Sequence, residues 1–231
     1  NMNRSELCAL SFSGGKDSIL ALDRAVRTNQ HVDYLVTMYD AVSERVRFHG
    51  VPIALIQAQA DALGIPLLSY PTTPEAFEAV FLQSLADLHQ HGVSMILFGN
   101  IHLADVRAWY EERTTAAGLT HLEPLWGDAP GTLVRECIAR GYRATITSIE
   151  LARAKPAWLG ATLTEALVED FEVTGIDPCG ERGEYHTFVS AGPLFARPLS
   201  IQLGDVVVQP GYQLVDIVLQ EEQMQKETFK H

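Results

Sequence analysis

Short apolar runs alternate with longer segments of helical period over the first 149 residues, and this alternation restricts the fold more than any other feature. Strands separated by helices form βαβ units, in which parallel strands share one sheet and helices cover both of its faces. The predicted strands are 7–12, 32–38, 67–70, 95–98 and 143–149, with a weaker candidate at 120–125. The predicted helices are 18–28, 51–63, 74–89, 105–117 and 131–140. The sequence therefore predicts an α/β fold with a doubly wound, mostly parallel sheet over residues 1–149.

The pattern changes after residue 149. A helical segment at 163–173 leads into a segment bearing glycine, proline and cysteine at 175–193. The β-like runs that follow are 199–203, 206–208 and 212–219, the last of them after a Pro210-Gly211 turn signal. We therefore expect a second, smaller α+β domain over residues 150–219 and a polar tail at 220–231.

Composition and charge argue against several classes of protein. Of the 231 residues 47% are hydrophobic, and 17 Lys plus Arg against 29 Asp plus Glu give a formal net charge of −12. A dedicated nucleic-acid binder carries a basic stripe, so this balance argues against a nucleic-acid partner. No apolar run approaches the roughly 18 residues of a membrane helix, and the N-terminus lacks the plan of a signal peptide. We expect a cytoplasmic protein with no membrane partner and, because Cys8, Cys137 and Cys179 are far apart, no disulfide framework or thiolate zinc site.

A glycine-rich turn follows the first predicted strand and leads directly into a helical pattern. It consists of Ser13, Gly14, Gly15, Lys16, Asp17 and Ser18. Adjacent glycines let the backbone approach a phosphate, the N–H groups of a helix N-terminus point at it, and Lys16 adds a positive charge. Ligands of α/β sheets bind beyond the carboxyl ends of the strands, which is where this turn lies. The residues thus predict an anion site, although such a turn can also be purely structural.

A second segment dense in reactive groups, the glutamate-rich segment at 175–189, lies in the predicted smaller domain. Glycines on both sides of Glu181 imply tight backbone geometry there. Glu184 and His186 would share a face if a strand begins at this point. Two carboxylates and an imidazole can bind a cation, orient an amine or take up its proton. On spacing alone, a turn with solvated glutamates explains the segment equally well.

The glycine-rich turn resembles the pyrophosphate-binding loop of the N-type ATP pyrophosphatases, the PP-loop superfamily. It is not a Walker A loop, whose first glycine would fall on Leu10. In the order typical of the diphthine–ammonia ligase family it is followed by Phe98-Gly99-Asn100-Ile101, Pro124-Leu125-Trp126, Trp158-Leu159-Gly160 and Gly-Glu-x-Gly-Glu-Tyr-His-Thr-Phe at 180–188. The resemblance covers residues 7–195 and implies a PP-loop, Rossmann-like nucleotide domain joined to a smaller domain with the glutamate-rich segment.

The resemblance also implies an activity. Enzymes of this kind cleave ATP between the α and β phosphates, adenylate a substrate carboxylate, release pyrophosphate and convert the acyl-adenylate to an amide with ammonia. In the founding reaction the carboxylate belongs to diphthine on elongation factor 2, and a small carboxylate metabolite is the alternative. ATP and magnesium are the implied cofactors, with Asp17 as the metal ligand, because Mg²⁺ usually takes one or two carboxylates plus phosphate oxygens.

The implied roles fall on named positions. The nucleotide would be held by Ser11, Ser13, Gly14, Gly15, Lys16, Asp17, Ser18 and Gly99. The implied catalytic residues are Lys16, Asp17, Glu181, Glu184 and His186, of which the last three would capture and deprotonate ammonium. The candidate substrate contacts are His49, Asn100, Asp105, Arg107 and Arg182. An ordinary loop histidine explains His49 equally well, helix capping does so for Asp105, and Arg182 could instead pair with a neighbouring glutamate.

Two other functions fit parts of the sequence. A PP-loop sulfur-transfer enzyme acting on tRNA needs reactive cysteines and a basic RNA surface, against which the separated cysteines and the charge of −12 argue. The other is a nucleotide-binding module that has lost catalysis, against which the intact glycine-rich turn argues, because such a loss would tend to remove Lys16 or Asp17. Edge strands of the smaller domain could pair two copies of the chain, so a homo-oligomer is a further expectation.

Overall fold

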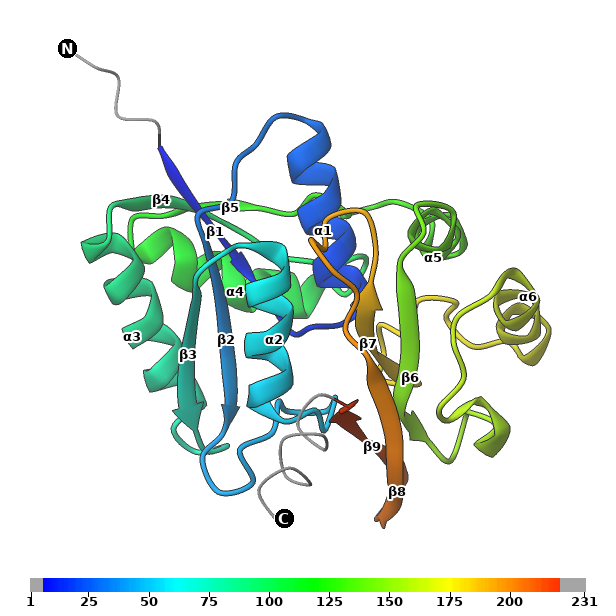
Figure 1. The fold of residues 1–231 in the computed structure, drawn as a ribbon. Helices are drawn as coiled ribbons and strands as arrows, with labels where there is room; N and C mark the ends of the chain where they lie inside the picture. The colour runs from blue at the N-terminus through cyan, green and yellow to red at the C-terminus, as the bar shows by residue number, and fades with distance from the viewer. Residues whose placement is uncertain (1–5, 221–231) are drawn as a thin grey trace.

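A computed structural model describes residues 6–220 as two sheets with helices packed around them (Figure 1). The first sheet is parallel, has five strands and follows the order β3-β2-β1-β4-β5. Its strands are β1 Leu7–Ser11, β2 Tyr34–Asp40, β3 Leu67–Thr72, β4 Val93–Leu97 and β5 Thr120–Leu122. The helices connecting them are α1 Lys16–Arg27, α2 Ile53–Leu63, α3 Phe77–Gln90 and α4 Ala104–Ala116. This confirms the predicted doubly wound sheet.

Both faces of the parallel sheet are covered, which is why its strands are apolar along most of their length. Cys8 and Leu10 of β1 belong to the core shared with α1 and α2. Ala9, between them, packs on the opposite face with α3 and the aromatic residues of α4. The strand order reverses between β1 and β4, and such a reversal leaves a crevice at the carboxyl ends of the two strands.

A second, antiparallel sheet follows the order β7-β6-β9-β8. Its strands are β6 Arg143–Glu150, β7 Tyr185–Ala191, β8 Ile201–Gln209 and β9 Tyr212–Leu219, accompanied by α5 Pro130–Ala139, the 3-10 helix η1 Pro156–Trp158 and α6 Glu165–Thr174. The expectation that the strand at 143–149 lies in the parallel sheet is wrong, because β6 pairs antiparallel with β7 and β9. Both faces of β6 are buried, and a central strand of a parallel sheet is buried in the same way. The sequence of β6 therefore does not show which strands it pairs with. The position of a domain boundary stays a prediction.

Strand β7 of the second sheet forms hydrogen bonds with the glycine-rich turn that follows β1 of the parallel sheet. The Val189 N–H of β7 donates to the Gly14 carbonyl at 3.0 Å. The Lys16 N–H donates to the Thr187 hydroxyl at 3.0 Å. The buried amide of Gln59 on α2 donates to the Gly14 and Val189 carbonyls at 2.9 and 2.7 Å. The two sheets are therefore joined at the turn itself.

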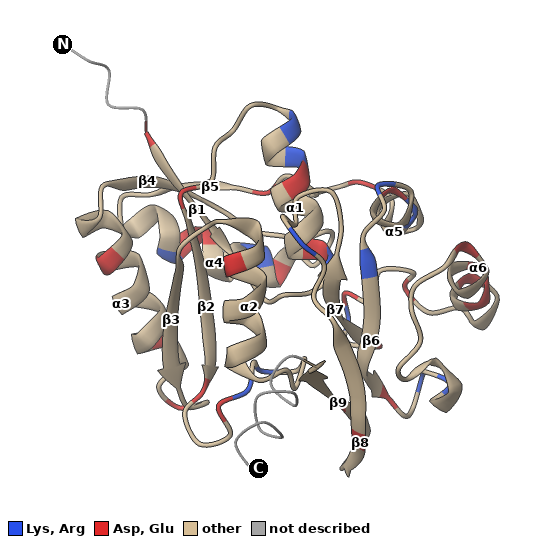
Figure 2. Ribbon diagram, in the orientation of Figure 1, with Lys and Arg blue, Asp and Glu red and all other residues tan. Residues whose placement is uncertain are grey.

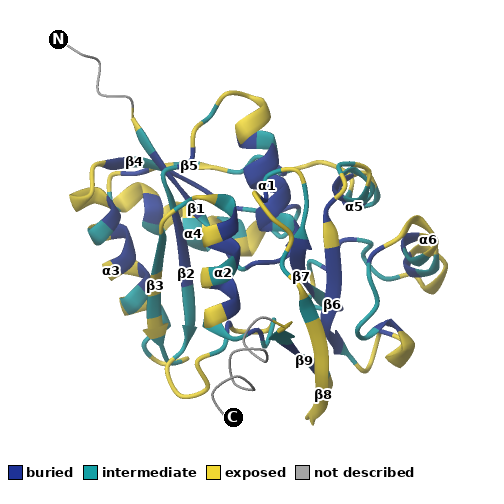
Figure 3. Ribbon diagram, in the orientation of Figure 1, coloured by how far each residue is buried: buried dark blue, intermediate teal, exposed yellow. Residues whose placement is uncertain are grey.

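Strand β8 forms an exposed edge of the second sheet (Figure 3). The runs predicted at 199–203 and 206–208 contribute to this one strand, whose pairing with β9 shifts between Leu203 and Val206. The polar tail predicted at 220–231 lies, except for residue 220, outside the described residues. Within residues 6–220, no helix is both long and apolar enough to cross a membrane.

Candidate active site

A cavity of about 300 Å³, the first cavity, lies at the carboxyl edge of the parallel sheet. Of the residues predicted to hold a nucleotide, all except Gly14 line it. Its apolar lining includes Val36, Met38, Phe77, Phe81, Phe98 and Tyr110. A concave site that combines a helix N-terminus and a lysine with an apolar, aromatic wall suits a phosphorylated ligand with a flat ring.

The glycines of the turn are required by close contacts. Gly14 has φ of +80°, and a Cβ there would lie 2.5 Å from Gln59 Oε1. A Cβ on Gly15 would lie 2.9 Å from Cε1 of His49. Helix α1 begins directly after Gly15, which has no side chain to cap it, and of its first N–H groups that of Lys16 donates to the Thr187 hydroxyl. The N–H groups of Asp17 and Ser18 are available to an anion.

Lys16 brings a positive charge into the first cavity. Its side chain is only 5% exposed, and Nζ donates to the Cys179 carbonyl at 2.5 Å. Nζ also lies 3.1 Å from Oδ1 of Asp17 and 5.0 Å from the centre of the Tyr185 ring. Burial disfavours the ammonium charge, but Asp17 and other neighbouring groups outweigh it and raise the pKa of Lys16 well above its usual range. The lysine therefore stays protonated at neutral pH.

The carboxyl of Asp17 lines the same cavity and is in an environment that favours a cation. Its pKa is raised, chiefly by burial, which the attraction of Lys16 opposes. The negative charges of Glu181 and Asp177 raise the pKa further. A cation placed among these carboxylates would relieve their repulsion.

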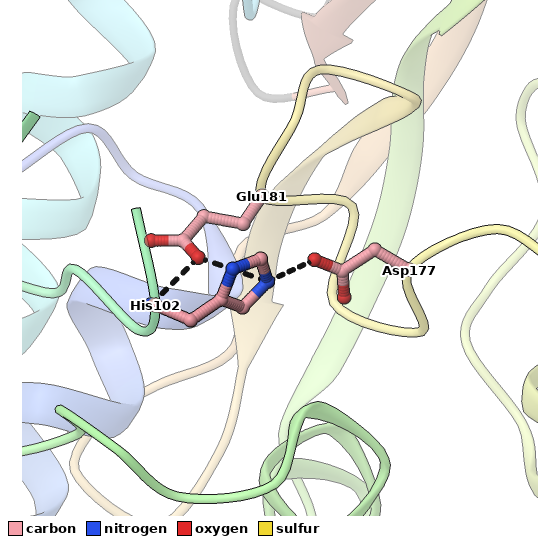
Figure 4. A group of neighbouring side chains, drawn as sticks. All are labelled: His102, Asp177 and Glu181. Carbon is pink, nitrogen blue, oxygen red and sulfur yellow. Dashed lines mark hydrogen bonds and ion pairs between the residues drawn. The ribbon is translucent and has the colours of Figure 1, made fainter. Parts of the chain in front are cut away.

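His102, Asp177 and Glu181 form a latch between the segment after β4 and the glutamate-rich segment (Figure 4). His102 Nε2 lies 2.5 Å from Asp177 Oδ2 and 3.1 Å from Glu181 Oε2. The Glu181 carboxylate also accepts the backbone N–H groups of Ile101 and His102, at 2.7 and 2.8 Å. These three side chains offer ligand atoms within 4.8 Å of one another. The latch holds the glutamate-rich segment against the parallel sheet, so Glu181 is not a solvated turn residue.

Glu184 and His186 do not share a cavity, and the condition under which they would share a face, a strand that already includes Glu184, is not met. Strand β7 begins only at Tyr185, so Glu184 still belongs to the turn. His186 lines the first cavity, whereas Glu184 is buried beside a separate surface groove that Arg182 also lines. Glu184 Oε2 accepts the Asp177 N–H at 3.0 Å, and Oε1 has no hydrogen-bond partner among the described residues.

Two neutral histidines stand beside the glycine-rich turn. The ring centres of His49 and His186 are 4.6 Å apart, and His49 Nδ1 lies 3.2 Å from the Thr187 carbonyl oxygen. Burial is the main cause that lowers the pKa of His49 to about 4. Burial and the neighbouring His49 also hold the pKa of His186 well below its usual range. Both rings are therefore uncharged at neutral pH and can accept a hydrogen bond.

The lowered pKa of His49 predicts a loss of stability in mild acid. Between pH 6.5 and 4 the unfolded chain binds a proton at this imidazole and the folded chain does not, so the free energy of unfolding falls as pH falls. The histidine should account for roughly 2 kcal/mol between pH 7 and 5. Urea denaturation of wild type and His49→Asn at both pH values measures this. A pH dependence that is the same in both proteins contradicts the prediction.

The remaining substrate candidates lie in different surroundings. Asn100 lines the first cavity, and its backbone N–H and Nδ2 donate to Glu123 at 3.2 and 2.9 Å. Glu123 pairs with His121 at 2.6 Å, and both side chains are almost fully buried. The pair of His121 and Glu123 was not identified from the sequence. A signal was present, because these two ionisable residues stand on either side of a leucine within the predicted strand 120–125. The buried pair fixes the orientation of the Asn100 amide.

Asp105, Arg107 and Arg182 do not line the first cavity. Asp105 is exposed in the first turn of α4 and does not cap the helix, whose N-cap residue is Leu103. Arg107 stacks on the ring of Trp126 at 4.7 Å. Arg182 is exposed and forms no ion pair with the carboxylates that the structure describes, so neither neighbouring glutamate holds it. The three residues therefore lie outside the first cavity, and their contact with a substrate stays a prediction.

The cysteines and the distribution of charge do not fit a sulfur-transfer enzyme. All three cysteines are free and buried, and burial raises the pKa of Cys8 and of Cys137 to about 12. Sulfur chemistry needs a thiolate, which these sites disfavour. Lysines and arginines are dispersed over separate elements of the ribbon (Figure 2).

Comparisons with known proteins agree with this geometry. A family model described as the diphthamide synthase N-terminal domain matches residues 7–121, and one described as the diphthamide synthase C-terminal domain matches residues 129–217. Diphthine–ammonia ligase of Mus musculus is 34% identical over 228 residues, which cover 87% of this chain and 84% of the relative. The same enzyme of Homo sapiens is 26% identical over 225 residues, with 87% of this chain and 84% of the relative covered. The chain therefore belongs to the diphthine–ammonia ligase family, a family of ATP-dependent ligases.

Proposed function

We propose that this enzyme activates a carboxylate with Mg-ATP as an acyl-adenylate and converts it to an amide with ammonia, releasing AMP and pyrophosphate. The observation that carries the proposal is the first cavity, where buried Lys16 and the N-terminus of α1 meet the glutamate-rich segment. The names of the relatives indicate diphthine and ammonia as substrates. Residues 1–149 would bind the nucleotide and residues 150–219 would serve the acceptor and ammonia. A cytoplasmic location and a homo-oligomer stay predictions.

In the first step a carboxylate oxygen attacks the α phosphorus, and the bond between that phosphorus and the bridging oxygen breaks. Pyrophosphate leaves with the electron pair. Negative charge grows on the α and β phosphate oxygens, which is where Lys16 and the N–H groups of α1 would stabilise it. Ser13 and Ser18 line the cavity and would donate hydroxyl hydrogen bonds to the same oxygens.

The residues around Asp17 fit a magnesium ion, because its carboxyl lines the first cavity and has a pKa raised in part by Glu181 and Asp177. When bound, the ion would neutralise phosphate charge. Asp17 would hold it together with phosphate oxygens, and Lys16 would keep its contact with the departing group.

In the second step ammonia nitrogen attacks the carbonyl carbon, the bond to the AMP oxygen breaks, and one proton is released. We propose Glu181, Glu184 and His186 as the group that captures ammonium and takes up its proton. His186 is neutral and lines the first cavity, so a ring nitrogen can accept a hydrogen bond from ammonium there. Glu184 is outside the cavity and would act by holding the Asp177 backbone, at 3.0 Å. His49 and Asn100 are the proposed substrate contacts.

Glu184→Gln should spare adenylation and reduce amide formation. The substitution alters the buried carboxylate that holds the Asp177 backbone and leaves the Lys16 contacts in place. Pyrophosphate release and amide formation are measured separately, with Glu172→Gln, an exposed partner of Arg135, as the matched control. Equal loss of both products counts against the assignment.

The test of the proposed function is product analysis with Mg-ATP, ammonium and a panel of carboxylates that includes elongation factor 2 bearing diphthine. AMP, pyrophosphate and an amide are expected. ADP as the only nucleotide product overturns the proposal. Pyrophosphate formed only when tRNA is added supports a tRNA-modifying enzyme, and tight ATP binding without AMP supports a non-catalytic module.

A further inference from the structure

A second cavity of about 540 Å³ adjoins the first one. It lies between the loop that connects β2 to α2 and the β8–β9 hairpin. Val207, Gln209, Tyr212 and Leu214 of the hairpin line it. The two cavities share Val46, and of two consecutive residues Phe48 lines the second cavity and His49 the first. A ligand in the second cavity is therefore next to the nucleotide site.

Arg47 lines the second cavity and carries a positive charge that no ion pair in the described chain neutralises, although Asp40, Asp205 and Asp216 line the same cavity. Its Cζ lies 4.6 Å from the ring centre of Phe48 and 6.0 Å from that of Phe77, a residue of the first cavity. It forms no ion pair with the carboxylates in the described part of the chain, whereas nearby Arg45 pairs with Asp216 at 2.9 Å. A guanidinium held by ring faces keeps its fork of N–H donors available for a carboxylate.

A column of rings leads from Arg47 to the glycine-rich turn. The Phe48 ring is stacked on the His186 ring, with centres 6.0 Å apart and planes at 16°. His186 in turn lies 4.6 Å from His49. His49 Cε1 is 2.9 Å from the point where a Cβ of Gly15 would lie. A continuous series of neighbouring side chains thus connects Arg47 in the second cavity with the proposed phosphate site at the glycine-rich turn.

The backbone of Phe48 is in an unfavourable conformation that the core does not require. Its φ of 65° is in the left-handed region, which bulky side chains rarely adopt. The side chain is not placed there to bury apolar surface, because Phe48 is 61% exposed. Such outliers occur preferentially at binding and catalytic sites. The strained residue is the one that supports Arg47 and covers His186.

We propose that the second cavity is the acceptor site, in which Arg47 binds the acceptor's carboxylate and Phe48 directs it to the nucleotide. The inference rests on the proposed function and adds the place where the acceptor's carboxylate binds. A protein carrier is favoured because apolar side chains that line the cavity are exposed: Phe48 by 61%, Val207 by 49% and Tyr212 by 37%. Exposed apolar surface next to a site is typical of a docking surface.

The first test measures KM values for the diphthine-bearing factor and for ATP in the variants Arg47→Ala and Arg47→Lys. For Arg47→Ala the KM for the factor should rise about tenfold or more while the KM for ATP stays unchanged, and Arg47→Lys should recover part of the loss. Arg143→Ala, which removes an exposed arginine from the start of β6, is the charge-matched control. An unchanged KM for the factor, or an equal rise in both KM values, overturns the inference.

The second test separates the effect of the Phe48 ring from the effect of its backbone conformation. Phe48→Gly removes the ring and relieves the left-handed conformation, so it should raise the KM for the factor without lowering the melting temperature. Glu44, at φ of 57° in the same loop, lines neither cavity. Glu44→Gly should match wild type in KM. A Phe48→Gly protein with the wild-type KM contradicts the role of the ring.

A binding measurement distinguishes failure of this inference from failure of the proposed function. Phenylglyoxal labels accessible arginines, and peptide mass spectrometry reports the labelling of Arg47 with and without the diphthine-bearing factor. Protection of Arg47 without any AMP formation supports the acceptor site and refutes the proposed reaction. Turnover with an unprotected Arg47 supports the reaction and refutes the acceptor site.

Discussion

Replacing Lys16 with alanine should lower the rate of AMP and pyrophosphate formation by roughly 10²–10³, which corresponds to about 2.7–4 kcal/mol of barrier. Nζ is the buried cation beside the N-terminus of α1, and its pKa is raised, so its charge is present at neutral pH. Its loss removes stabilisation at the point where phosphate charge grows. Single-turnover assays of pyrophosphate release measure the effect.

The fold of the Lys16→Ala protein is checked by its melting temperature, because the substitution also frees Asp17 and the Cys179 carbonyl. Lys155→Ala is the matched control. Lys155 is about half exposed and pairs with Asp170 of α6, so the Lys155→Ala protein should turn over like wild type. Wild-type turnover in a folded Lys16→Ala protein refutes the phosphate site.

Glu181→Gln is expected to weaken both the fold and the first chemical step. The carboxylate accepts two backbone N–H groups and contacts His102, and a glutamine keeps only one acceptor oxygen. The free energy of unfolding should fall by about 1.5–3 kcal/mol, the value of a hydrogen bond to a charged group. Pyrophosphate release should fall with it, because the latch holds the segment whose Cys179 carbonyl contacts Lys16.

Urea denaturation and pyrophosphate release test the Glu181→Gln protein. The comparison with Glu184→Gln is informative, because that variant should retain pyrophosphate release. Glu165→Gln alters an exposed partner of Arg135 and should change stability by less than about 1 kcal/mol. If the Glu181→Gln protein has the same free energy of unfolding and the same rate of pyrophosphate release as the control, the latch has no role in positioning the site.

The sequence identified the candidate site where local pattern and chemistry agree. The glycine-rich turn lies at the end of a buried strand and at the start of a helix, and all of its predicted nucleotide contacts except Gly14 line the first cavity. Gly14 is needed for a different reason, since a side chain there would collide with Gln59. No local pattern contains that contact, because it joins residues 45 positions apart.

What the amino-acid order alone determined was the parallel α/β sheet, the turn after β1 and the resemblance to a ligase family, because each depends on neighbours along the chain. Only the tertiary structure decided that β6 belongs to the second sheet, that Glu184 and His186 separate, and that Arg47 is left without an ionic partner among the described residues. Those outcomes depend on which distant segments meet. Periodicity along one strand or helix shows that a face is buried, but it does not show what buries it.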